Sequence, residues 1–188
     1  MGKTLPNTAL FKLEGKIDGW VYRRRNGQVI VAKKPDFSEV VPSAAQLRHR
    51  ERFLKALAYG QEVMKDPAKA APYKTRAEGT LGNGFALAVR DYMLLPLVKE
   101  LDLVSYNGQV GDEIKIDAVD DFEVVSVKVT IKHAGTGAVI EQGLATLVAG
   151  FWYYHGTTQI ATGQTVLIEA EAKDRAGHDT ALSETWTA

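Results

Sequence analysis

The chain has 188 residues, 45% of them hydrophobic, and its 23 Lys and Arg balance its 23 Asp and Glu. This composition is ordinary for a globular protein of one large or two small domains. No apolar run approaches the roughly 18 residues that span a bilayer, and the first residues lack the features of a secretory signal peptide. The absence of cysteine excludes disulfides, thiolate metal sites and cysteine nucleophiles. We therefore expect a cytoplasmic protein without membrane insertion, which leaves incorporation into a particle or non-classical export open.

The neutral total hides two halves of opposite charge. Residues 1–101 contain 18 Lys and Arg against 10 Asp and Glu, whereas residues 102–188 contain 5 against 13. Such halves indicate two units with different surfaces, which can attract each other within one molecule or between copies. We predict a basic domain over 1–101 and an acidic domain over 102–188.

A β-hairpin is predicted near the start of the chain. The runs "IDGWVYRRR" and "QVIVAKK" have strand composition, and the Asn26-Gly27 pair between them suits a two-residue type I′ turn. This turn fixes the register of the two strands: Arg25 with Gln28, Arg24 with Val29, Arg23 with Ile30, Tyr22 with Val31, Val21 with Ala32 and Trp20 with Lys33.

The two faces of this hairpin differ in character. Alternate side chains of a strand point to opposite faces, so Arg24 is separated from Arg23 and Arg25 and the triplet does not form one patch. We expect one face to belong to a core; it carries Trp20, Tyr22, Val29 and Val31.

Six basic residues are the candidate contacts for a partner or an anion: Arg23, Arg25, Lys33, Lys34, Arg48 and Arg52. Three interpretations stay open. Lys and Arg protect an edge strand from wrong pairing, they contact an acidic protein surface, or they neutralise the phosphates of a nucleic acid. Nucleic-acid binding is the least favoured of the three, because it also needs exposed aromatic rings and Trp20 and Tyr22 are expected to pack.

Helices are predicted between the hairpin and residue 101. Ser43 and Gln46 form a capping-box pattern before a helix over 44–65, whose apolar face contains Leu47, Phe53, Leu54, Leu57 and Met64. Glu51 is placed to pair with Lys55. Asp66-Pro67 ends this helix and starts another, which Pro72 breaks or restarts. After the loop "EGTLGNG", "FALAVRDYMLLPLVKEL" has helical spacing and is kinked or ended by Pro96.

From about Asp102 the hydrophobic period changes from that of a helix to that of a strand. Seven short strands are predicted, separated by turn-forming segments, which is typical of a β-sandwich. They are "LVSYN", "EIKIDAV", "EVVSVKVTIKH", "AVIEQGLAT", "FWYYH", "TVLIEAEAK" and "DTALSETWT".

The segment "GDEIKIDAVDDFEVVSVKVTIKHAGTGAVIEQG", the aromatic strand "FWYY" and the hairpin "TVLIEAEAKDRAGHDTA" together resemble a bacterial immunoglobulin-like domain, over residues 103–188. The Cys-Trp-Cys pattern of antibody domains is absent. The resemblance implies a fold class of α+β: an N-terminal β-hairpin plus helices, followed by an all-β immunoglobulin-like sandwich. Such modules serve as spacers, adhesins or binding units, so the fold alone does not imply a function.

The first hundred residues are similar to uncharacterised bacterial proteins, some phage-like, that open with a "VYRxRxGQxxVxKKP" hairpin. In those proteins a helix with a Gln-x-x-x-Arg pattern follows, and Gln46 and Arg50 occupy those positions here. The family has no assigned activity, so the resemblance implies no catalytic residue.

Motifs for catalysis or metal binding are weak. His49, His133, His155 and His178 are scattered without ligand spacing, no G-x-S-x-G elbow occurs, and "GTLGNG" matches no phosphate-binding fingerprint. Calcium is an alternative at the sandwich loops, if their aspartates converge; these are Asp117, Asp120, Asp121, Asp174 and Asp179. We predict no catalytic residue, metal ligand or cofactor.

These observations predict a non-enzymatic structural or protein-interaction protein, a subunit or adaptor of a bacterial or phage-like assembly. Its partner is another protein or a second copy of the chain, which would make it a homo-oligomer. The alternative is a nucleic-acid-binding protein that uses the basic half.

Overall fold

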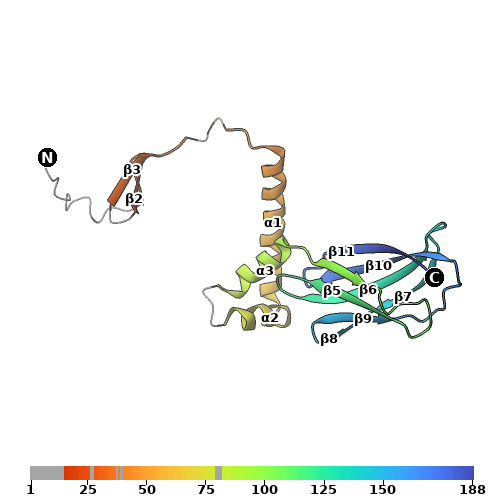
Figure 1. Ribbon diagram of the computed structural model, residues 1–188. Coiled ribbons are helices and arrows are strands. Elements are labelled where there is room, and N and C mark those ends of the chain that lie inside the picture. Colours follow the sequence, from red (N-terminus) through yellow and green to blue (C-terminus); the bar gives the residue numbers. More distant parts are fainter. Residues whose placement is uncertain (1–14, 26–27, 37, 39, 79–81) are drawn as a thin grey trace. The chain divides into compact units, whose positions relative to one another are not determined.

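The computed structural model describes residues 15–25, 28–36, 38, 40–78 and 82–188 (Figure 1). Its contacts divide the chain into two compact units, Met1–Gln46 and Leu47–Ala188. These units differ from the predicted domains 1–101 and 102–188, because the helices group with the C-terminal sheets. The predicted boundary after residue 101 falls inside strand β4 (Leu97–Asp102).

The N-terminal unit contains a three-stranded antiparallel sheet of β1 (Gly15–Ile17), β2 (Trp20–Arg25) and β3 (Gln28–Lys33), in that order. The register of β2 and β3 is the predicted one in all six pairs, from Trp20–Lys33 to Arg25–Gln28. The predicted turn residues, Asn26 and Gly27, lie outside the described residues.

Strand β1 was not predicted from the sequence. Asp18 and Gly19 both have positive φ, 45° and 77°, and they join Ile17 to its partner Trp20 in a two-residue turn. This is the Asp-Gly signature of a type I′ hairpin. The expectation that "IDGWVYRRR" forms one strand is therefore wrong, because its Asp-Gly pair turns the chain.

The apolar face of this sheet is exposed in the structure. Ile17 pairs with Trp20, and Tyr22 pairs with Val31, so these four positions share a face. Ile17, Trp20 and Val31 are 44%, 47% and 44% exposed. The prediction that this face belongs to a core is not met within the described residues, because three short strands provide no second layer to cover it.

Helix α1 (Ala44–Lys65) begins at the predicted capping box. The Ser43 N–H donates to Oε1 of Gln46 at 2.9 Å, and the Gln46 N–H donates to Oγ of Ser43 at 3.3 Å. The predicted ion pair between Glu51 and Lys55 is also present, at 2.9 Å.

The buried side of α1 differs from the predicted one. Leu47, Phe53 and Leu54 are exposed, whereas Ala56, Gly60 and Val63 are buried. The physical reason is close packing on a neighbouring helix: a Cβ placed on Gly60 would lie 2.9 Å from Cγ2 of Val89. Small residues therefore form the contact, and the large apolar residues of the first turns remain outside it.

Helix α2 (Pro67–Ala77) follows directly, with Oδ1 of Asp66 accepting from the N–H of Ala68 at 2.9 Å. The prediction of a new helix at Asp66-Pro67 is confirmed. Pro72 lies inside α2 instead of breaking it, because burial of Ala70 and Tyr73 on the same helix outweighs the lost backbone hydrogen bond.

Helix α3 (Gly84–Met93) is capped by Asn83 and ends three residues before Pro96. Of the two expectations for Pro96, a kink or an end of the helix, the structure therefore shows the end. Leu97–Asp102 forms strand β4, where Val98 and Leu101 are buried. This segment forms a strand despite its helical spacing because it pairs with β5 (Glu113–Val119).

The remaining strands form two four-stranded antiparallel sheets, with orders β11-β10-β6-β7 and β4-β5-β9-β8. Most predicted strands are present, but "LVSYN" is not a strand. The strands are β5 (Glu113–Val119), β6 (Val124–His133), β7 (Val139–Leu144), β8 (Thr146–Val148), β9 (Phe151–His155), β10 (Thr165–Asp174) and β11 (Asp179–Thr187).

The two sheets share one hydrophobic core. Alternate residues of β5 and β10 are buried, as the two-residue period of a strand requires. Ile114 and Ile116 from one sheet meet Val129, Val166 and Ile168 from the other, and all five are fully buried. The mixed α+β class is confirmed, with a β-sandwich as the larger part.

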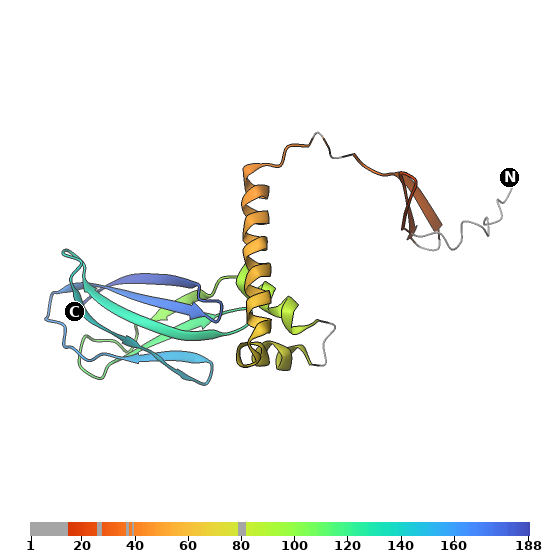
Figure 2. The ribbon, with the colours of Figure 1, turned by 180° about the vertical axis from the view of Figure 1, so that it is seen from behind.

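The helices gather at one end of this sandwich in both views (Figures 1 and 2). Val63, Tyr73 and Ala88, one from each helix, form a second small core that Phe122 of the β5–β6 turn joins. The Tyr73 and Phe122 rings lie 4.4 Å apart. No helix in the described ranges is long and apolar enough to cross a membrane.

The position of β4 predicts how fragments of the chain behave. Residues 47–188 should unfold cooperatively, with a thermal midpoint within a few degrees of that of the full chain. Residues 102–188 lack Val98 and Leu101, and losing large core residues costs about 2–5 kcal/mol each. Their midpoint should be about 10 °C or more lower, measured by circular dichroism. Equal midpoints for the two fragments would contradict the placement of β4.

Candidate functional site

The six predicted contact residues are divided between the two units. Arg23, Arg25 and Lys33 belong to the N-terminal sheet, and Lys34 follows it; of these, the exposed side chains described are Arg23, Lys33 and Lys34. Arg48 and Arg52 are exposed on α1, in the other unit. They line a groove with side chains that sequence reasoning did not select, Tyr92, Leu95 and His178.

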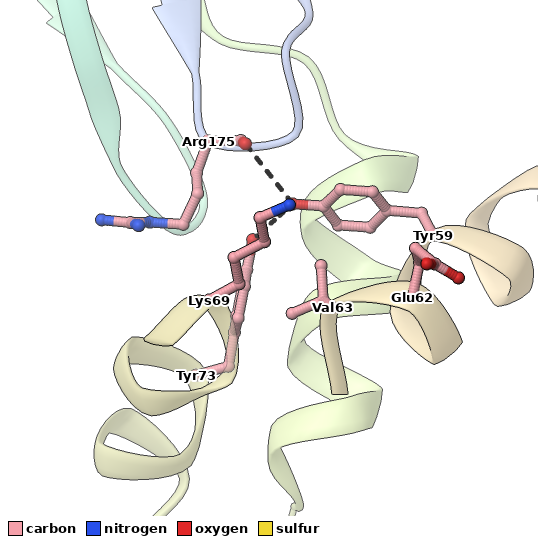
Figure 3. Close-up of a pocket in the computed structure, with 6 residues that line it drawn as sticks. All are labelled: Tyr59, Glu62, Val63, Lys69, Tyr73 and Arg175. Atoms are coloured by element: carbon pink, nitrogen blue, oxygen red, sulfur yellow. Dashed lines mark hydrogen bonds between the residues drawn. The ribbon is translucent and has the colours of Figure 1, made fainter. Parts of the chain in front are cut away.

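A chain of hydroxyl groups links the three helices to the sandwich (Figure 3). The Tyr59 and Tyr73 hydroxyls lie 2.9 Å apart and point toward each other, and the Tyr59 hydroxyl is 3.4 Å from the backbone carbonyl oxygen of Arg175, in the β10–β11 turn. The Tyr73 hydroxyl donates a hydrogen bond to Oδ2 of Asp91. One residue from each helix thus takes part: Tyr59 from α1, Tyr73 from α2 and Asp91 from α3.

Asp91 is fully buried, and its second oxygen, Oδ1, has no hydrogen-bond partner among the described residues. Burial raises the pKa of Asp91 to about 6, opposed by the hydrogen bond from Tyr73. Asp120 and Asp174 raise this pKa further and Arg175 lowers it. Burial also raises the pKa of Tyr73, so its hydroxyl stays protonated and acts as a donor.

The protonation state of Asp91 decides how many of these hydrogen bonds can form at the same time. With Asp91 ionised, Tyr73 donates to the carboxylate, and the single proton of Tyr59 serves either Tyr73 or the Arg175 carbonyl. With Asp91 protonated, the acid can donate to Tyr73, Tyr73 to Tyr59, and Tyr59 to the carbonyl. All three of these pairs then form a hydrogen bond, and no charge is buried.

A pocket of about 300 Å³ lies beside the Tyr59 and Tyr73 hydroxyls (Figure 3). Its charged groups are engaged with neighbours: Glu62 with Lys65 at 2.9 Å, Lys69 with Asp66 at 4.0 Å, and Arg175 with Glu123 at 2.5 Å. The Arg175 guanidinium points away from the hydroxyls. A catalytic set needs a nucleophile, a base and an orienting group within reach of each other, and the described groups lining this pocket do not provide one.

Four of the five aspartates considered for calcium have protein partners, among them Asp117, which is 3.8 Å from Lys99. Oδ2 of Asp120 accepts from the N–H of Phe122 at 2.8 Å, Asp121 pairs with Arg90, and Asp174 accepts from the N–H and ring nitrogen of His178 at 2.7 and 3.0 Å. Within residues 15–188, excluding the undescribed positions, no three His, Asp or Glu side chains are grouped to hold a metal ion. These carboxylates cap turns and pair with cations.

Sequence reasoning missed Tyr59, Tyr73 and Asp91. Tyr59 and Asp91 lie inside helical segments without a motif, and a lone Asp among apolar residues, as in "ALAVRDYML", is the one signal that could have suggested burial. The connection itself spans distant parts of the chain, from Tyr59 to Arg175.

The raised pKa of Asp91 predicts a pH-dependent stability. The folded state binds this proton more tightly than the unfolded chain, so the stabilisation is complete below the ordinary Asp value near 4 and is lost as the pH rises through about 6. Asp91→Asn carries no charge to bury. The unfolding free energy of Asp91→Asn relative to the unchanged protein should therefore rise by on the order of 3 kcal/mol between pH 4 and pH 8, measured by urea denaturation.

Two further variants control this experiment. Tyr73→Phe removes the hydrogen bond that lowers the pKa of Asp91. The pH at which this variant loses the stabilisation from protonated Asp91 should therefore be higher. Asp179→Asn changes an exposed aspartate and should run parallel to the unchanged protein. If Asp91→Asn also runs parallel, Asp91 does not titrate in this range.

No protein-family model matches the sequence, and a search of curated proteins gives no match. Solved structures resemble parts of the chain. An engineered protein has 15% identity and a TM-score of 0.37, over 52% of this chain and 20% of its own. CopC from Methylosinus trichosporium OB3b has 13% identity and a TM-score of 0.35, over 50% and 91%. A bromine derivative of BhCBM56 has 18% identity and a TM-score of 0.31, over 43% and 85%.

The chain thus spans about a fifth of the length of the engineered protein. TM-scores of 0.31 to 0.37 carry no argument about the function of this chain.

Proposed function

We propose that this protein is a non-enzymatic interaction protein, a subunit that associates with further copies of itself through its N-terminal sheet. The exposed apolar face of that sheet carries the proposal. Three-stranded sheets need a packed hydrophobic face for stability, and Ile17, Trp20 and Val31 have no cover among the described residues of their unit.

The energy available from covering this face is considerable. A buried Trp removes about 150–250 Å² from water, and Trp20 is half exposed. At about 25 cal/mol per Å², burying the remainder of Trp20 alone contributes roughly 2–3 kcal/mol. Ile17 and Val31 add to this term.

Charge favours the acidic sandwich of a second copy as the surface that covers the sheet. Exposed Arg23, Lys33 and Lys34 accompany the apolar residues, and residues 102–188 contain 13 Asp and Glu against 5 Lys and Arg. A contact between different surfaces of two copies is heterologous, and it builds rings or filaments. A subunit of an assembly fits this arrangement.

We propose further that the sandwich is immunoglobulin-like. The orders β4-β5-β9-β8 and β11-β10-β6-β7 correspond, in chain order, to the A-B-E-D and G-F-C-C′ sheets of that fold. This correspondence supports the proposal independently of the sequence resemblance. A module of this kind presents its loops and edges to partners, consistent with a structural role.

Self-association should depend on both charge and the apolar face. By sedimentation, the apparent mass should exceed one chain at high protein concentration in 50 mM salt and fall toward one chain in 1 M salt, because screening shortens the reach of charges. Trp20→Ser should weaken association at least tenfold, which is 1.4 kcal/mol, and Arg23→Glu about fivefold or more.

Lys128→Glu is the matched control for this charge reversal. It makes the same charge change on an exposed strand residue of the sandwich and should leave association unchanged or strengthen it. A monomer under all conditions would overturn the proposal. Salt-sensitive retention of the monomer on oligonucleotides, lost in Arg23→Glu, would instead identify a nucleic-acid-binding protein.

A further inference from the structure

A second surface lies on the C-terminal unit, between α1 and the segment that follows α3. It is a groove of about 300 Å³. Arg48, Glu51, Arg52 and Lys55 line its helical side, and Tyr92, Leu95 and His178 line the other. Because Glu51 is paired with Lys55, the two arginines leave the groove with a positive charge. It is separate from the N-terminal sheet, because all of these residues belong to the unit Leu47–Ala188.

The helical period places the cations over this groove. Positions 48, 52, 55 and 59 follow one face of α1. Tyr59 anchors that face, with its ring 5.2 Å from the ring of Tyr92. The residues from 44 to 55 are all exposed. Arg48 and Arg52 therefore lie on the same face as Tyr59, in earlier turns of the helix, and are not packed against other described residues.

Two of the cations lack a counter-charge. Lys55 pairs with Glu51 at 2.9 Å, and the His178 ring bonds to Asp174 at 3.0 Å. Arg48 and Arg52, by contrast, have no ion pair with any described residue. Like charges one helical turn apart repel each other, so an anionic ligand bridging the two guanidinium groups would remove an unfavourable interaction.

The wall opposite the arginines is apolar and aromatic. Leu95 is 48% exposed. The Tyr92 ring is already in contact with two rings, Tyr59 at 5.2 Å and His178 at 4.6 Å. These contacts reduce the ring surface on which a nucleobase could stack, whereas an aliphatic side chain can pack on Leu95.

We propose that this groove binds an extended acidic segment of a partner protein. Two carboxylates of the segment meet Arg48 and Arg52, which can bind each of them in a bidentate manner. Carboxylates two residues apart on one side of an extended chain are about 6.6–6.8 Å apart, comparable to the 5–6 Å between helix positions one turn apart. An apolar side chain of the segment packs on Leu95.

Several acidic groups of the sandwich are already engaged within the chain. Asp120 caps a turn, Asp121 pairs with Arg90, and Glu169 pairs with Lys132 at 2.9 Å. A second copy that offered these three groups to the groove would have to break their contacts first. The proposal therefore commits to a partner protein.

The test uses the full chain and a fluorescein-labelled synthetic peptide with glutamates at alternate positions and a central leucine. In fluorescence anisotropy at 50 mM salt, Arg48→Glu with Arg52→Glu should weaken binding at least tenfold. Leu95→Ser, which changes no charge, should weaken it about threefold. Arg50→Glu reverses one charge on the same helix, at a position that does not line the groove, so it should leave binding within twofold.

Thermal unfolding checks that the variants remain folded, which their exposed positions favour. The proposal is overturned if Arg50→Glu weakens binding as much as the double variant, since the attraction would then be general. It is also overturned if an oligonucleotide of equal charge displaces the peptide, or if the double variant abolishes self-association, which would make a second copy the occupant. Trp20→Ser should leave peptide binding unchanged, so this test and that of self-association can fail separately.

Discussion

Helix α1 is held to α3 by a close approach at Gly60, and to the sandwich by the hydroxyl of Tyr59. Gly60 allows the helix to lie against Val89 and Phe85 of α3, where a Cβ would come within 3.0 Å of both side chains. At this distance the hydroxyl of the adjacent Tyr59 reaches Tyr73 and the Arg175 carbonyl. The helical part of the unit depends on this junction, because its own core consists of three buried residues.

The packing of α1 at this junction also determines which of its side chains are exposed. Contacts concentrate on the second half of α1, so the first turns carry exposed arginines and leucines without cover. The groove beside Arg48 and Arg52 exists because Tyr59 fixes the helix next to Tyr92 while the turns before it extend past the packed region. A buried carboxylate, Asp91, lies at the other end of the same hydrogen-bond chain. The contacts of Tyr59 therefore account both for the packing of the second half of α1 and for the exposure of its first turns.

The candidate sites were only partly accessible to sequence reasoning. The basic residues were found as a set, since charge is read directly from the sequence, but the set joined positions from two units. Arg48 and Arg52 share a groove with Leu95 and His178, which are distant in the chain. Likewise, the pKa of Asp91 is raised because the folded structure buries its carboxyl group. Such juxtapositions depend on which segments meet, and local patterns carry no information about that.

Local chemistry by itself determined the hairpin register, the capping box at Ser43 and most strands of the sandwich. Turn residues and side-chain alternation act over a few residues, so the sequence contains them in full. Tertiary structure decided whether Leu97–Asp102 became helix or strand, which face of α1 was buried and where the units divide. In the first two cases the local preference was weak, and the pairing of β4 with β5 and the approach at Gly60 contributed the larger free energy.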